Sequence, residues 1–124
     1  MWNEIFGWIS VLGSLAMGLV MGIKFQREDW LGGYNAFPRR MVRLAHIALA
    51  ALGMLNILFA QSQARLEMAA ATARIASVSF VAAAIFMPAC CLYLAARRRH
   101  FEIFALPIFS LATGLILTIG GLLR

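Results

Sequence analysis

The sequence has little charge, and four long stretches have none. Charged residues make up 13% of the 124 positions, whereas hydrophobic residues make up 63%. A soluble domain of this size needs more polar surface than this composition supplies. No other stretch is long enough to build a separate soluble domain. We therefore expect a single domain over residues 1–124 that is embedded in a membrane.

The four uncharged stretches are each long enough for a membrane-spanning helix, which takes about 20 apolar residues. They predict spans at about 5–23, 41–60, 75–96 and 103–123. No basic residue precedes the first stretch, as a secretory signal would require, so we expect a retained helix. The short connection 97–100 makes the last two helices antiparallel neighbours. The predicted fold is an all-α integral membrane protein, a four-transmembrane-helix bundle with up-down-up-down topology.

Acidic side chains are also missing from the interior of these spans. The five acids lie at or beyond the span ends: Glu4, Glu28, Asp29, Glu67 and Glu102. A proton-coupled transporter is disfavoured, because it needs a buried carboxylate. The sequence has no Ser/His/Asp or Cys/His arrangement, no metal-ligand spacing and no glycine-rich phosphate loop. We therefore expect no enzymatic activity and no metal site.

Only two cysteines are present, and they are adjacent. Cys90 and Cys91 lie inside the third predicted span, where neighbouring side chains on a helix diverge. A structural disulfide between them is implausible, so the cysteines do not indicate a redox compartment.

Basic residues are concentrated in two of the three connections. Eight lie on one predicted face: Lys24, Arg27, Arg39, Arg40, Arg43, Arg97, Arg98 and Arg99. Arg65, Arg74 and Arg124 lie on the other. Basic loops stay in the cytoplasm, so this asymmetry predicts a plasma (inner) membrane protein with both termini on the non-cytoplasmic side. Topology accounts for most of the net charge of +6, and we expect no nucleic-acid partner.

Six of these arginines are also candidates for contact with lipid headgroups, including anionic lipids such as cardiolipin. They are Arg39, Arg40, Arg43, Arg97, Arg98 and Arg99.

Small and polar residues at helical spacing predict how the helices pack. Ser14, Gly18 and Gly22 recur every four residues in the first span, and Ser110, Gly114 and Thr118 do so in the fourth. Small residues let helix backbones approach closely in lipid. At one predicted depth Asn56 could meet Ser79 and Thr118, as a polar bridge between helices.

His46 is the only ionisable side chain well inside a span, which makes it the first functional suspect. Gly18, Cys90, Cys91 and Pro107 should lie at a similar depth, and Pro88 could widen the packing nearby into a pocket. Three interpretations remain open. His46 could be an axial ligand of haem b, although His100 is too shallow to be its partner. It could bind a quinone carbonyl, with Trp30 or Tyr34 nearby. It could also simply be bonded to a neighbouring carbonyl.

Taken together, these patterns favour a non-catalytic accessory or scaffold subunit that packs against itself or against other subunits of a larger membrane complex. Respiratory and other energy-converting complexes are the candidates. The alternative is an electron-transfer subunit that holds haem b or quinone at His46. The third hypothesis is a small channel or transporter.

Overall fold

The structure is a computed structural model that describes residues 2–66 and 68–123. Over these residues the chain forms four α-helices: α1 (Trp2–Lys24), α2 (Phe37–Ser62), α3 (Ala70–Arg97) and α4 (Ala105–Leu122). Short 3₁₀ turns lie in the connections: η1 (Trp30–Gly32), η2 (Gln63–Arg65) and η3 (Phe101–Phe104). Two charged residues counted above, Glu67 and Arg124, lie outside the described residues.

Each α-helix is long and apolar enough to cross a membrane, which confirms the predicted all-α membrane fold. Pro38 stands in the first turn of α2, where its missing N–H costs no helical hydrogen bond. Pro88 lies inside α3, and the helix continues through it to Arg97. α3 begins five residues before the predicted span, so it extends beyond the apolar stretch.

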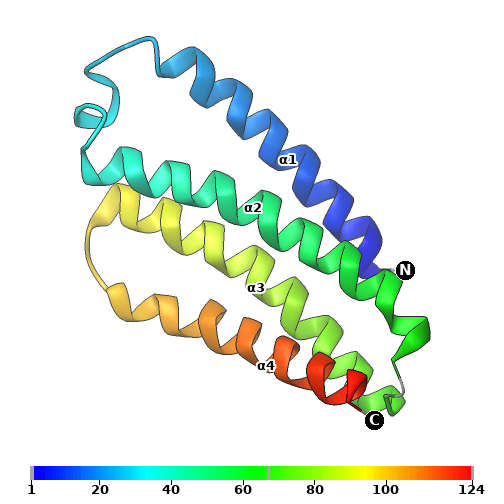
Figure 1. The fold of residues 1–124 in the computed structure, drawn as a ribbon. Coiled ribbons are helices and arrows are strands. Elements are labelled where there is room, and N and C mark those ends of the chain that lie inside the picture. Colours follow the sequence, from blue (N-terminus) through cyan, green and yellow to red (C-terminus); the bar gives the residue numbers. More distant parts are fainter. Residues whose placement is uncertain (1, 67, 124) are drawn as a thin grey trace.

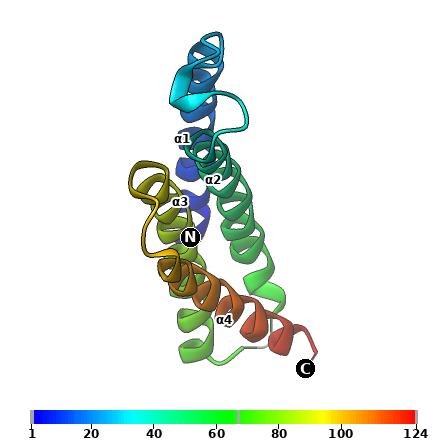
Figure 2. The same ribbon diagram turned by 90° about the vertical axis from the view of Figure 1, so that its left-hand side faces the viewer.

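The helices lie side by side in chain order, from α1 at the top of Figure 1 to α4 at the bottom. Successive helices run in opposite directions, as predicted. Each packs against its neighbour in sequence, α1 on α2, α2 on α3 and α3 on α4, and α1 also touches α3. Figure 2 shows the same arrangement from the side. Among the described residues α1 and α4 share no substantial contact, so the bundle is open.

The two ends of the bundle differ in composition. Both termini and the connection between α2 and α3 lie at one end, on the right of Figure 1. We call this the terminal end. The connections between α1 and α2 and between α3 and α4 lie at the other, which carries the eight basic residues. We call it the basic end.

The core is formed by α2 and α3 in the middle of the row. Phe59, Leu66, Ala76 and Phe80 make one buried cluster, in which the rings of Phe59 and Phe80 lie 4.9 Å apart. Ala48, Leu52 and Ala84 make a second. Both clusters join neighbouring helices, so the buried side chains lie at the centre of the row and its two edges are exposed.

Candidate functional site

Three buried or half-buried polar groups join α1, α2 and α3 towards the terminal end. Nδ2 of Asn3 donates to Oδ1 of Asn56 at 2.8 Å and to the carbonyl of Ser77 at 3.1 Å. The Ser77 hydroxyl donates to Oδ1 of Asn3. Nδ2 of Asn56 donates to the carbonyls of Leu52 at 2.9 Å and Phe80 at 3.1 Å. We call Asn3, Asn56 and Ser77 the asparagine network. Its two amides satisfy each other and the backbone, so it is built as a structural bridge.

The partners of Asn56 differ from those that matched depths predicted. The Ser79 carbonyl accepts a hydrogen bond from Ser110 at 3.0 Å, which joins α3 to α4. Thr118 donates within its own helix, to Gly114 at 2.7 Å. Neither residue bonds to Asn56. Helical rise gives only the depth of a side chain, whereas its partner also depends on which face of each helix meets the other.

Sequence reasoning missed Asn3 and Ser77. Asn3 precedes the predicted first span at 5–23, but α1 begins at Trp2 and includes it. A signal was available, because Asn3, Gly7, Ser10 and Ser14 are small or polar at spacings of three or four and all are buried. The packing face of α1 therefore begins at Asn3, two residues before the apolar stretch.

Glycine contacts set how closely the helices approach. A Cβ on Gly7 would lie 2.6 Å from the carbonyl oxygen of Gly53, so α1 and α2 meet there backbone to backbone. Gly114 lies against the ring of Phe80, with 3.2 Å to the nearest ring atoms from a built Cβ. Gly22 was predicted to share a stripe with Ser14 and Gly18, but within the described residues a Cβ there would meet nothing within 4 Å. The helices diverge before they reach it.

His46 lies against α1 on the side towards the basic end. Oγ of Ser14 is 3.2 Å from Nδ1 of His46 and donates to the His46 carbonyl at 3.1 Å. A Cβ on Gly18 would lie 2.9 Å from Cε1 of the imidazole. We call these three residues the histidine contact. Ser14 thus contacts His46 at both Nδ1 and the backbone carbonyl, whereas Nε2 has no hydrogen-bond partner among the described residues.

The other residues predicted at this depth have contacts of their own on α3 and α4. Sγ of Cys90 is 3.6 Å from the carbonyl of Ile103, a contact that joins α3 to the start of the last span. Cys91 is fully buried, and Pro107 is buried in the first turn of α4. The hollows described on the molecule do not include His46 in their lining. Because the imidazole lies directly against the α1 backbone, that side leaves no space for a macrocycle.

At the basic end, Arg39 has a different position from the one predicted. It is 3% exposed, and its guanidinium donates to the carbonyls of Glu28 and Phe25, both at 3.3 Å. The guanidinium carbon lies 4.3 Å from the ring centre of Phe25 and 5.8 Å from those of Trp30 and Tyr34. Arg39 therefore holds the folded connection 25–36 onto α2, and its burial keeps it from a lipid headgroup.

The remaining arginines at this end are more accessible. Arg43 lies 4.6 Å from the ring centre of Tyr34 and donates to the Tyr34 carbonyl at 3.4 Å. Arg98 lies over the ring of Phe37 at 5.4 Å. Arg40, Arg97, Arg98 and Arg99 are exposed.

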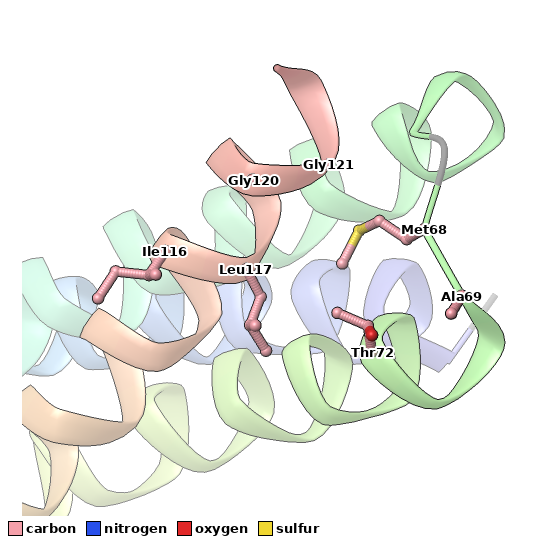
Figure 3. A pocket seen from close by; sticks show the side chains of 7 residues that line it. All are labelled: Met68, Ala69, Thr72, Ile116, Leu117, Gly120 and Gly121. Atoms are coloured by element: carbon pink, nitrogen blue, oxygen red, sulfur yellow. The ribbon is translucent and has the colours of Figure 1, made fainter. Parts of the chain in front are cut away.

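A hollow of about 250 Å³ lies at the terminal end, between the start of α3 and the end of α4 (Figure 3). Its lining consists of Met68, Ala69, Thr72, Ile116, Leu117, Gly120 and Gly121. The Met68 side chain reaches over Gly121, where a built Cβ would lie 2.6 Å from Cγ of Met68. Thr72 supplies the one side-chain hydroxyl, so the hollow is an apolar gap beneath the connection between α2 and α3.

No protein-family model, no curated protein and no solved structure matches this chain. Any function has to be inferred from its own residues.

Proposed function

We propose that the chain is a non-catalytic accessory or scaffold subunit that docks against other membrane-embedded chains through its two edge helices. The observation that carries this proposal is the open row, in which α1 and α4 lie at opposite edges without packing on each other. An apolar edge is stable in lipid by itself, so exposure alone does not imply a partner. The small residues left on those edges are the more specific support.

On α1 the outward face has a notch. Ile9, Gly13, Ala16 and Val20 follow one another at spacings of three or four, and all four are exposed. Among the described residues a Cβ on Gly13 would meet nothing within 4 Å. Gly13 and Ala16 would let a helix of another chain approach the α1 backbone closely.

α4 carries a comparable face on the opposite edge. Phe109, Thr113, Ile116 and Gly120 recur at the same spacings and are exposed. Thr113 satisfies its hydroxyl within the helix, by donating to the Phe109 carbonyl at 2.9 Å. Gly120 is as open as Gly13. Both edges therefore offer close helix approach without an unsatisfied polar group.

The test uses variants that fill the notches at positions where a Cβ would meet no atom of the described residues within 4 Å. We expect purification in a mild detergent to recover a partner chain, or a second copy, at fixed stoichiometry, and the reciprocal purification to recover this chain. Gly13→Leu or Gly120→Leu should lower that recovery about tenfold, the effect of roughly 1.4 kcal/mol lost at an interface. Gly22→Leu is the matched control, because Gly22 is equally open but lies half a turn round α1 from Gly13. Equal recovery with all three variants would refute docking through these faces.

The proposal includes an orientation in the plasma (inner) membrane, with the basic end in the cytoplasm and both termini outside. Its support is the excess of basic residues at one end. Single cysteines introduced into a variant without Cys90 and Cys91 report it through an impermeant thiol reagent in intact cells. A cysteine near the carboxyl terminus should be labelled, and one at Arg99 should be protected. The reverse pattern would overturn the orientation.

One observation supports the alternative hypothesis, an electron-transfer subunit that holds haem b or quinone at His46. Nε2 of His46 has no hydrogen-bond partner among the described residues, so it is free to hydrogen-bond a quinone carbonyl or to ligate haem iron. A purified sample with no Soret band and no extractable quinone would exclude this alternative. A Soret band that His46→Ala abolishes would establish it in place of the scaffold role. Solute flux into liposomes would instead favour the channel or transporter hypothesis.

A further inference from the structure

An aromatic contact at the basic end joins the start of α2 to the connection between α3 and α4. Phe37, the first residue of α2, meets Phe101 edge to face at 5.9 Å between ring centres. The guanidinium of Arg98 lies over the Phe37 ring of this pair, 5.4 Å from its centre. The start of α2 and the connection between α3 and α4 therefore form one surface, at the left of Figure 1.

The positive charge on this surface is not neutralised by the protein. Within residues 2–66 and 68–123, the one ion pair is between Nδ1 of His100 and Oε1 of Glu102, at 2.9 Å. None of the described arginines or lysines has a carboxylate within ion-pair distance. Glu28, Asp29 and Glu102 are the acids at this end, against eight basic residues. The surface therefore attracts anions.

Burial decides which arginines can reach a ligand. Arg39 is enclosed by the connection 25–36, and Arg43 is partly occupied by the backbone and ring of Tyr34. Arg40 follows Phe37 by three residues, so the two lie on one side of the first turn of α2. Arg40 and Arg98 are both exposed, and the Arg98 guanidinium lies over the Phe37 ring. Arg97 and Arg99 flank Arg98 and add to the local charge.

We infer that Arg40 and Arg98 bind the phosphate of an anionic phospholipid, with the Phe37 and Phe101 rings beneath its glycerol and the first carbons of its acyl chains. Guanidinium groups match phosphate oxygens in pairs, which an ammonium group cannot do. A lipid is favoured over a soluble phosphate because the rings lie where the apolar span begins, and Phe101 is 54% exposed there. This site does not include the residues of the two docking faces on α1 and α4, so it does not depend on the docking role.

The experiment must separate a site from the general excess of basic residues that orients the protein. Arg40→Lys/Arg98→Lys keeps every positive charge, so orientation is preserved, but it removes both paired donors. The probes are phosphatidylglycerol and phosphatidylcholine, added to the detergent-purified chain and followed by native mass spectrometry. We expect the wild type to hold phosphatidylglycerol in preference to phosphatidylcholine. The double variant should hold it about tenfold less tightly, the loss of roughly one charge-assisted hydrogen bond.

The matched control is Arg65→Lys/Arg74→Lys at the terminal end, which should bind phosphatidylglycerol as the wild type does. Three results would overturn the inference. They are equal binding by the Arg40→Lys/Arg98→Lys variant, equal binding of the two lipids by the wild type, and displacement of phosphatidylglycerol by soluble glycerol phosphate at matched concentration. The last result would show that the rings and acyl chains contribute nothing. Equal thermal stability of the variants in phosphatidylcholine confirms that the fold is unchanged.

Discussion

The asparagine network and the histidine contact are both polar and both lie on the packing face of α1. They differ in how many helices they join and in how completely their polar atoms are paired. The network joins three helices, and its central residue, Asn56, is fully buried with all its amide bonds directed to α1, α2 and α3. The histidine contact joins only α1 and α2, and the imidazole is half-buried, with one ring nitrogen that has no partner among the described residues. A closed network suits a structural role, and an unpaired nitrogen leaves room for a ligand.

The two regions also differ in what the glycines of α1 face on α2. Near the network, Gly7 faces the carbonyl oxygen of Gly53, which cannot move without moving α2. At the histidine contact, Gly18 faces the tip of an imidazole, which can rotate. The end of the α1–α2 interface near the network is therefore rigid, and the other end is adaptable. Four substitutions test this difference, from the largest expected effect to the smallest.

Gly7→Ala should be the most damaging. Its new methyl group would lie 2.6 Å from both the Gly53 oxygen and Cγ1 of Ile57, so the helices must separate. Overpacking of this kind costs about 2–3 kcal/mol of unfolding free energy. Equilibrium unfolding in mixed micelles measures it. Gly13→Ala, on the open face of the same helix, is the control and should unfold like the wild type. A Gly7→Ala protein of unchanged stability would show that the interface is not rigid there.

Asn56→Leu should be next. It removes the bonds to Asn3 and to the Phe80 carbonyl and leaves one Asn3 donor without its partner. Interhelical bonds in membranes contribute about 0.6 kcal/mol each, and up to about 1.7, so a loss of about 1–2 kcal/mol is expected by the same unfolding assay. Thr118→Val removes a hydroxyl that bonds within its own helix and should cost less. A larger loss in Thr118→Val would contradict the assignment of the bridge to Asn56.

Gly18→Ala should cost less than about 1 kcal/mol, although its built Cβ also makes a short contact, because the imidazole of His46 can turn away. Comparison with Gly7→Ala in one unfolding series tests the contrast directly. If the two variants lose equal stability, the histidine contact is as rigid as the network.

His46→Leu should have the smallest effect on unfolding, about 0.5 kcal/mol, the value of one interhelical bond. Ser14 keeps a partner in the carbonyl of residue 46, which the substitution does not remove. Equilibrium unfolding measures the loss of stability, and an absorbance spectrum of the same sample shows whether a Soret band is present. A loss above about 2 kcal/mol would place His46 with the network and give it a structural role.

Sequence patterns were sufficient to locate the four helices, but they did not predict which side chains contact one another. Charges at the ends of apolar stretches located all four helices to within five residues, because charge is costly inside a bilayer. They did not place the ends, since polar residues such as Asn3 can continue a helix when packing satisfies them. Nor could they separate Arg39 from Arg40. These neighbours differ only in direction around α2, and the fold of the connection 25–36 decides which one is buried.

The order in which the helices pack also bears on how the chain assembles during synthesis. Each helix packs mainly on the one made just before it, so α1 and α2 can pair as soon as both are inserted. Asn3 and Asn56 then satisfy each other within this first hairpin. The arrival of α3 supplies the Ser77 and Phe80 carbonyls that complete their bonding. The network therefore favours insertion in order, because without α3 the Asn3 and Asn56 amides would each lose one hydrogen bond in lipid.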